Sequence, residues 1–505
     1  MATMNSVFSH FSTVFLTPLK HLKKKYLPLL AVYFAFGAQQ LTVVAITFWQ
    51  KEFLGLSALE LSAISVWVSL PFAMKILFGP LVDGMALFGS KRKVYIFLGA
   101  LLISAQFLLL YGLATEIPWI IELASIKTIY LTALILGTVG FVIQDITADT
   151  LSTEVVDRTE KSAEEIQKEL GMVQVLGRLF LYFGSMATAG LGGYLASQYS
   201  FETVMLIALG IPMISVLGAL FVRIRCTVEG VSPRFSRGFW LGILAYAASV
   251  LYFLFAEIPF AQEITFVVSL TILLFIISTL VKKMPNFPIK TIFLAFLMIF
   301  VYRAVPGVGP GFSWFAIENL GFDQAFFGVL AQTSAIIGVG ALWLMADWIA
   351  RCSIRRVFFV LIIVSTLLSL PDIMLYYGIH ETLGLSAKTI ALIDTAAGSP
   401  LINLAMVPML TLIAITVPAT GKATWFAVIA STMNLALTAQ HLGTKYLNTI
   451  FPISNAEYDA TGTMISAGNY EALGPLLWWS VGIGLAMSLI VWCFCPKKIS
   501  PTVNQ

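Results

Sequence analysis

Long apolar stretches recur along this chain of 505 residues, with short polar segments between them. An α-helix needs about 20 predominantly apolar residues to cross the hydrocarbon core of a bilayer. The chain is therefore expected to be an all-α, multi-pass integral membrane protein. The stretches long enough to span a membrane predict fourteen helices, at residues 27–49, 61–83, 94–114, 128–153, 171–197, 201–222, 238–256, 264–281, 291–316, 325–347, 357–379, 389–416, 423–444 and 473–495.

The basic residues follow the alternation of these helices. Of the 30 Lys and Arg residues, 23 lie in the tails and loops on the side of the N-terminus. The opposite loops hold four, which are Lys51, Lys127, Lys388 and Lys445. Because cytoplasmic loops carry the excess of Lys and Arg, the bias predicts both termini in the cytoplasm. The charge bias does not identify the membrane, and we expect the cell membrane, of the inner or plasma type.

Composition supports the membrane class and excludes others. Hydrophobic residues make up 59% of the chain and charged residues 11%, which a soluble protein of this length would not tolerate. The net charge of +4 is explained by topology, so no nucleic-acid partner is expected. The sequence has no Walker A motif, no nucleophile–base pair and no metal-binding cluster, so we expect no ATP-driven pump, no enzyme, no cofactor and no metal.

Two polar elbows between apolar helices share one pattern. Asp83 is followed eight residues later by a basic pair, and Asp347 is followed by a basic pair at the same spacing. Elbows in corresponding places, at 79–93 and 343–356, predict a transporter of two related halves that closes its cytoplasmic gate there. The residues assigned to the gate are Gly79, Asp83, Gly89, Lys91, Arg92, Glu154, Asp347, Arg355 and Arg356.

The distance between the elbows indicates an insertion. Asp347 lies 264 residues after Asp83, whereas a six-helix repeat needs roughly 200 residues. The additional residues are therefore expected to form the inserted linker between the two halves.

The charged stretch 154–170 is expected on the cytoplasmic surface, as a short helix or a solvated loop. The predicted organisation is a cytoplasmic tail (1–26), an N-terminal six-helix half (27–223), a linker with two extra membrane helices (224–290), a C-terminal six-helix half (291–495) and a second cytoplasmic tail (496–505).

Arg303 is a charge in the middle of a predicted membrane helix. It is followed closely by PGVGPG (306–311), which cannot continue a regular helix. Irregular backbone at membrane depth requires surrounding protein or a water-filled cavity. A guanidinium beside such a segment predicts a site for an anionic substrate. The alternative is an arginine paired with a carboxylate that only locks the helix.

A second group of charges lies in the predicted fourth helix. Asp145 and Asp149 are four residues apart and share one helix face. Two adjacent carboxylates in a low dielectric suit a proton-coupled step. Alternatively they pair with Lys75 and Arg178 in a structural charge network, and the two interpretations are compatible.

These motifs resemble a known family. The runs LPFAMKILFGPLVDGMALFGSKRKVY (70–95), QDITADTLSTE (144–154), ENLGFDQAFFGVLAQTSAIIGVG (318–340) and ATWFAVIASTMN (423–434) are similar to segments of the folate–biopterin transporter family of the major facilitator superfamily. The resemblance covers most of residues 27–450. The chain departs from the family at Ala86 and Val94, where proline is common, and at Arg178, which has no match in the family pattern.

The resemblance implies a major facilitator fold, and the chain is expected to be a monomeric symporter that is coupled to protons. Its substrate would be a flat organic anion such as folate or a pterin, moved by alternating access. From the positions of the charges themselves, Arg303 is expected to hold the substrate carboxylate, with Lys75 and Arg178 as further binding cations. Asp145 and Asp149 would carry the proton.

Two alternatives stay open. The muropeptide permeases and acetyl-CoA transporters have similar motifs in the second and fourth helices, but usually a different spacing between the elbow Asp and the basic cluster. A non-transporting membrane receptor or assembly factor could lose its core charges, whereas Lys75, Asp145, Asp149 and Arg303 all remain.

Overall fold

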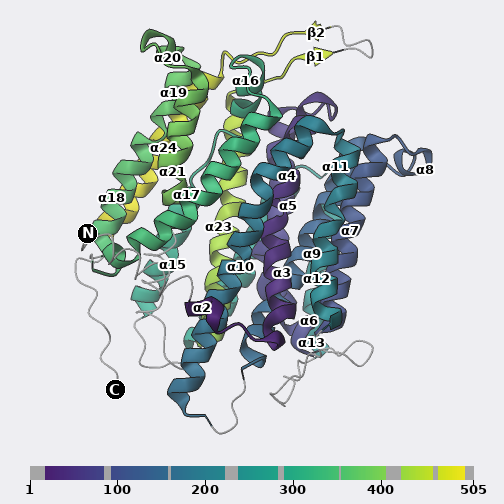
Figure 1. Ribbon diagram of the computed structural model, residues 1–505, viewed down its shortest axis with the longest axis vertical. Helices are drawn as coiled ribbons and strands as arrows, with labels where there is room; N and C mark the ends of the chain where they lie inside the picture. The colour runs from purple at the N-terminus through teal and green to yellow at the C-terminus, as the bar shows by residue number, and fades with distance from the viewer. Residues whose placement is uncertain are drawn as a thin grey trace. The chain divides into compact units, whose positions relative to one another are not determined.

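The computed structural model describes residues 17–84, 92–156, 161–221, 237–256, 258–282, 289–351, 354–404, 422–458 and 464–494. Within these ranges the chain is helical apart from its turns, its connections and one pair of short strands (Figure 1). It divides into two compact units. The first is formed by Met1–Ile46 with Leu77–Trp240, and the second by Thr47–Ile76 with Leu241–Gln505.

The first unit is built mainly of long apolar helices. The helix α3 packs against α10 and α12, and α7 packs against α9. Its helices are α2 (Thr17–Lys20), η2 (Lys24–Tyr26), α3 (Leu27–Ala38), the start of α4 (Gln40–Glu52), most of α6 (Lys75–Gly84), α7 (Lys93–Ala114), α8 (Pro118–Ile121), α9 (Ile126–Glu154), α10 (Ala163–Gln198), α11 (Phe201–Ala208) and α12 (Gly210–Phe221).

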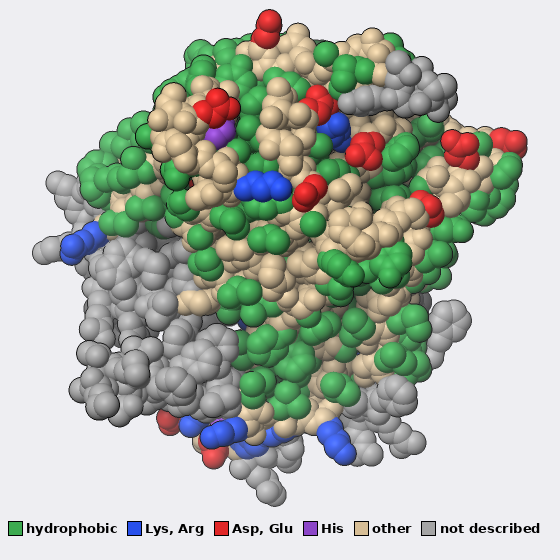
Figure 2. Space-filling model, turned by 45° about the horizontal axis from the view of Figure 1, so that its top comes forward, with side chains coloured by type: hydrophobic (Ala, Val, Ile, Leu, Met, Phe, Trp, Pro, Cys, Tyr) green, Lys and Arg blue, Asp and Glu red, His purple; other side chains and the backbone are tan. Residues whose placement is uncertain are grey.

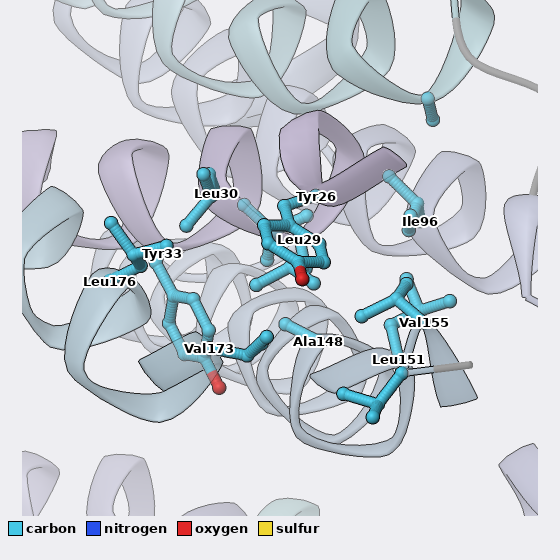
Figure 3. Packing of buried hydrophobic residues seen from close by; sticks show 13 residues of the cluster. Tyr26, Leu29, Leu30, Tyr33, Ile96, Ala148, Leu151, Val155, Val173 and Leu176 are labelled. Atoms are coloured by element: carbon cyan, nitrogen blue, oxygen red, sulfur yellow. The ribbon is translucent and has the colours of Figure 1, made fainter. Parts of the chain in front are cut away.

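The core of the first unit lies between α3, α9 and α10. Figure 3 shows Tyr26, Leu29 and Leu30 packed with side chains from the neighbouring helices, and all three are almost fully buried. The helices α3 and α10 approach so closely that a Cβ added at Gly184 would lie 2.1 Å from the Phe34 carbonyl oxygen. Glycine is therefore required at this crossing, as is common where membrane helices touch.

The second unit contains the remaining helices and the two strands. A hydrophobic cluster joins α14, α15 and α23, with Leu273, Ile299 and Val428 buried in it. The elements are α5 (Ala58–Ala73), most of α13 (Arg237–Phe255), α14 (Ala261–Lys282), α15 (Ile289–Arg303), α16 (Gly311–Glu318), α17 (Gln324–Arg351), α18 (Ile354–Leu367), α19 (Leu370–Tyr376), α20 (Ile379–Thr382), α21 (Ala387–Leu404), α23 (Lys422–Ile450), β1 (Glu457–Tyr458), β2 (Met464–Ser466) and α24 (Leu473–Phe494).

The loop between α23 and α24 forms a small hairpin. The strands β1 and β2 pair antiparallel, with Glu457 opposite Ser466. An isolated bridge between Ser454 and Asn469 extends the pairing toward the helices. The described parts of this loop therefore have regular pairing.

Every one of the fourteen predicted ranges contains helix within the described residues. In that part of the chain, nine helical segments are long and apolar enough to cross a membrane. A tenth results if α5 and α6, which meet at a bend of 42°, are taken as one span. The exact number of fourteen spans, like the placement of both termini in the cytoplasm, stays a prediction.

Large apolar side chains remain exposed on these helices, as lipid-facing surfaces require. Leu101 is 65% exposed and Phe275 is 70% exposed. The helix α13 has no buried residue at all. Figure 2 shows hydrophobic side chains, in green, over much of the face that it draws. A contiguous apolar surface of this kind is typical of a protein that lies in lipid.

Candidate functional site

A membrane helix is interrupted directly after Arg303. The helix α15 ends at this residue, and α16 begins only at Gly311. Between them the chain lacks regular secondary structure, as its prolines and glycines predict. Gly309 has φ = +80°, a left-handed conformation that glycine adopts without strain.

Polar side chains of α23 and α24 satisfy the backbone of this interruption. The Gly307 N–H donates to Thr444 Oγ1 at 2.9 Å. Asn448 Nδ2 donates to the Val308 carbonyl at 3.1 Å, and Ser480 Oγ donates to the Pro306 carbonyl at 2.9 Å. Because a bilayer offers no water to such groups, these contacts allow the backbone to be irregular. The Gly307 N–H is used in this conformation, so an anion here would depend on the guanidinium of Arg303.

The side chain of Arg303 is half-buried and points toward α23. Its Nε donates to the carbonyl oxygen of Met433 at 3.3 Å. In the described part of the chain, no carboxylate forms an ion pair with it. The alternative of a structural ion pair therefore has no partner among these residues, and most of the donors of Arg303 are available for an anion.

A second interruption lies between α5 and α6. Pro71 is inside α5, and the chain bends by 42° before α6 begins at Lys75. Proline lacks an N–H and disturbs the hydrogen bonds of the preceding turn. Asn434 Nδ2 donates to the Phe72 carbonyl at 3.1 Å, and the Ile76 N–H donates to Ser431 Oγ at 3.3 Å.

Both interruptions meet the same turn of α23, at residues 431–434. Arg303 reaches it through Met433, and Lys75 stands next to Ile76, whose N–H binds Ser431. Two of the predicted substrate-binding cations are therefore brought beside one turn within the second unit. Ser431 and Asn434 belong to the run that resembles the family, but no sequence pattern indicates that they bind the backbone of a helix bend.

The two predicted proton carriers lie in the first unit, around a tyrosine. Tyr33 of α3 donates to Asp149 Oδ1 at 2.7 Å. Asp145 and the exposed Arg178 also act electrostatically on the Tyr33 side chain. The structure thus brings Asp145, Asp149 and Arg178 together. Sequence reasoning missed Tyr33, because a tyrosine in an apolar helix is ordinarily a core residue.

The first elbow contains a buried ion pair. Arg92 donates to Glu154 from Nε at 3.0 Å and also from Nη2, while its Nη1 donates to the Val82 carbonyl at 2.6 Å. The two side chains are 6% and 13% exposed. A bidentate pair of this kind is geometrically specific. It ties the end of α6, the start of α7 and the end of α9 together, and the gating role of both residues stays a prediction.

The other predicted gate residues are seen only in part. Gly79 lies within α6, and Arg356 is exposed on α18. Gly89 and Lys91 lie outside the described residues, as do the side chains of Asp83, Asp347 and Arg355. The correspondence between the two elbows stays a prediction.

A second buried ion pair was not predicted. Lys51, at the end of α4, lies 2.9 Å from Glu318, at the end of α16, and their side chains are 5% and 14% exposed. The Ala456 N–H donates to the same Glu318 oxygen at 2.9 Å, and Asn455 Nδ2 donates to the Lys51 carbonyl at 2.6 Å. From the sequence, Lys51 is only a loop cation, because no sequence pattern pairs residues so far apart.

The sequence matches a known family along most of its length. The model of the BT1 family matches residues 37–481. A folate-biopterin transporter of Synechocystis sp. is 24% identical over 451 residues, which are 89% of this chain and 80% of that protein. Folate transporter 2 of Plasmodium falciparum is 23% identical over 84% of this chain and 80% of its own length.

Solved structures with a similar fold are transporters too. A peptide transporter POT in complex with sulfate has a TM-score of 0.65 at 14% identity, with 94% of each chain covered. A D-xylose-proton symporter has a TM-score of 0.53 at 15% identity, with 94% of this chain and 97% of its own covered. At such identities the likeness shows the fold alone. The expected fold class, an all-α membrane protein of the major facilitator type, is confirmed.

Proposed function

Because the chain belongs to the BT1 family, we propose that it is a secondary transporter that moves an organic anion, such as a folate or a pterin, by alternating access. The observation that carries this proposal is the meeting of two interrupted helices, each with a cation, at residues 431–434 of α23. Interrupted membrane helices form the substrate sites of many secondary transporters. The names of the relatives, a folate-biopterin transporter and a folate transporter, support the substrate class.

Arg303 is the residue proposed to hold the substrate carboxylate. Its guanidinium is planar and always charged, and it presents a fork of donors that matches a carboxylate. Only its Nε is engaged by the Met433 carbonyl among the described contacts. Lys75 supplies a second positive charge at the same turn, and Arg178 is proposed as a further binding cation in the first unit. Because no carboxylate pairs with Arg303 among the described residues, its charge in the membrane favours an anionic substrate as its partner.

Asp145 and Asp149 are proposed to carry the coupling proton. An anion that enters a cell with a negative interior needs a driving ion. Protonation of Asp149 would remove the charge that accepts the Tyr33 hydrogen bond, so proton binding would be transmitted to α3. The Arg92–Glu154 pair and the Lys51–Glu318 pair are proposed as contacts that form and break as the transporter cycles.

Uptake of labelled folate and biopterin into vesicles that contain the purified protein tests the substrate class. Arg303→Ala should abolish uptake, and Arg303→Lys should leave a small fraction because an ammonium cannot form a two-point contact. Arg237→Ala, at an exposed arginine that begins α13, is the matched control and should transport normally. Normal uptake by Arg303→Ala would refute the anion-binding role.

A pH gradient across the same vesicles tests the coupling. Uptake should rise when the outside is acidic, and Asp149→Asn should remove this dependence. Unchanged uptake under an imposed gradient would eliminate proton coupling while leaving the substrate proposal intact. A correctly inserted protein that takes up neither compound would instead favour a carrier of muropeptides or acetyl-CoA, or a non-transporting membrane protein.

A further inference from the structure

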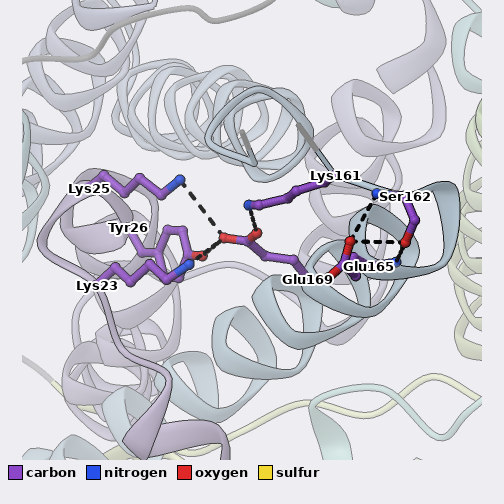
Figure 4. Close-up of polar contacts among 7 residues, drawn as sticks. All are labelled: Lys23, Lys25, Tyr26, Lys161, Ser162, Glu165 and Glu169. Atoms are coloured by element: carbon purple, nitrogen blue, oxygen red, sulfur yellow. Dashed lines mark hydrogen bonds and ion pairs between the residues drawn. The ribbon is translucent and has the colours of Figure 1, made fainter. Parts of the chain in front are cut away.

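Glu169 is the centre of a group of cations in the first unit that the proposed transport mechanism does not use. Its Oε1 accepts hydrogen bonds from Lys23 Nζ and Tyr26 Oη, each at 2.6 Å, and Lys25 Nζ lies 3.8 Å away. Its Oε2 accepts from Lys161. Figure 4 shows these side chains converging on Glu169 from the segment before α3 and from the start of α10.

The position of Glu169 follows from how α10 begins. Ser162 and Glu165 form a capping box, in which the side chain of each residue accepts a hydrogen bond from the backbone N–H of the other. This box starts the helix eight residues before the predicted membrane segment at 171–197. The charged stretch is therefore helical from residue 163 and continuous with α10. Its first turns project beyond the apolar part of the helix.

The carboxylates of this surface do not balance its positive charge. The segments 20–27 and 161–169 together contain six lysines and three glutamates. Three of the lysines surround Glu169, and their side chains are 29% to 49% exposed. The other three, Lys20, Lys24 and Lys168, are exposed and have no ion pair within the described residues.

Apolar side chains lie among these cations. Leu22 is 42% exposed and Leu27 is 40% exposed. Leu27 is also the first residue of α3, where the chain enters its first apolar helix. A surface that offers both lysines and exposed leucines at the end of a membrane helix matches the headgroup region of a bilayer, where cations meet phosphates and leucines meet acyl chains.

We propose that this surface, formed by residues 20–27 and 161–169, binds the headgroup of an anionic phospholipid. Lys20 and Lys24 contact the phosphate, while Glu169 holds Lys23, Lys25 and Lys161 in place beside them. The exposed leucines favour a lipid over a soluble phosphate. On the predicted topology this surface faces the cytoplasmic leaflet, which carries the anionic lipids.

The test is a titration of the purified full-length protein in detergent with short-chain phosphatidylglycerol, read as the shift of its thermal unfolding midpoint. Because each lysine near an anionic lipid surface contributes roughly a fivefold gain in affinity, Lys20→Gln/Lys24→Gln should bind about thirtyfold more weakly. Lys127→Gln/Lys388→Gln removes the same charge from two other predicted loops and should bind like the wild type. Lys20→Arg/Lys24→Arg should also bind like the wild type.

Two results would overturn the proposal. Equal weakening in the two Gln variants would show that only overall charge matters. An equal midpoint shift with phosphatidylcholine or with inorganic phosphate, at the same concentrations, would show that the surface does not select an anionic lipid. The expected pattern is a shift with phosphatidylglycerol alone, weakened only in the Lys20→Gln/Lys24→Gln variant and reduced by salt.

Discussion

The ammonium of Lys51 lies 2.9 Å from the carboxylate of Glu318, and both side chains are largely shielded from solvent. The pair joins the end of the first predicted membrane helix to the end of the ninth. The hairpin loop reinforces it, because Ala456 and Asn455 bind Glu318 and the Lys51 backbone. The contribution of a shielded pair to stability is seen mainly when one partner is removed. The remaining charge is then buried without a partner, which destabilises the folded protein.

Loss of the Lys51 charge should destabilise the protein far more than loss of an exposed lysine. Lys51→Gln leaves Glu318 buried without its cation, which we expect to cost about 3–5 kcal/mol. The control is Lys388→Gln, which removes an exposed pair with Asp323 whose atoms are 3.8 Å apart and should cost less than about 1 kcal/mol. Thermal unfolding in detergent measures both, and equal midpoints would refute the importance of the buried pair.

Because α3 and α10 cross closely, substitutions of two glycines in α10 should have different effects on stability. A Cβ at Gly184 would meet the Phe34 backbone, whereas a Cβ at Gly171 would have nothing within 4 Å. Gly171→Ala should therefore be neutral or stabilising by up to about 1 kcal/mol through helix propensity. Gly184→Ala should destabilise by about 1–3 kcal/mol through overpacking. Unfolding midpoints compare them, and a stabilising Gly184→Ala would contradict the close approach.

The features that the sequence predicted correctly are those that a bilayer imposes on any chain. The lengths of the apolar stretches predicted the helices, and the PGVGPG segment predicted the interruption after Arg303. Both features depend only on neighbouring residues in the sequence. The resemblance to the folate–biopterin transporters is confirmed, and with it the expectation that the chain is not an enzyme.

The contacts that the sequence did not predict join residues from distant helices. In a helix that is apolar all round, the sequence does not show which face meets which neighbour. Tyr33 beside Asp149, and Asn434 beside the bend after Pro71, could therefore not be found. Arg92 and Glu154 were both predicted as gate residues, because they belong to motifs with charges at helix ends. The ion pair between them was not predicted.

The Arg92–Glu154 pair should depend on the shape of the guanidinium as well as on its charge. Arg92→Lys retains the charge but loses the two-point contact with Glu154 and the bond to the Val82 carbonyl. We expect a loss of about 1–3 kcal/mol in stability. Lys93→Arg, at the next residue, keeps its charge and is the control. Equal unfolding midpoints for Arg92→Lys and the wild type would show that charge alone suffices.

The bend after Pro71 should depend on side chains of α23. Asn434→Ala leaves the Phe72 carbonyl without its donor, and membrane hydrogen bonds of this kind contribute roughly 1–2 kcal/mol. Thr449→Ala is the control on the same helix, because its exposed hydroxyl bonds only to its own helix backbone at Lys445. Unfolding midpoints should fall for Asn434→Ala and stay unchanged for Thr449→Ala.

A second substitution separates the bend from general stability. Pro71→Ala restores a backbone donor and should straighten the junction between α5 and α6, which makes the Asn434 contact unnecessary. Stability should therefore recover in the Pro71→Ala/Asn434→Ala double variant, while folate uptake should fall because Lys75 leaves the 431–434 turn. Uptake that stays normal in Pro71→Ala would show that the bend is only structural.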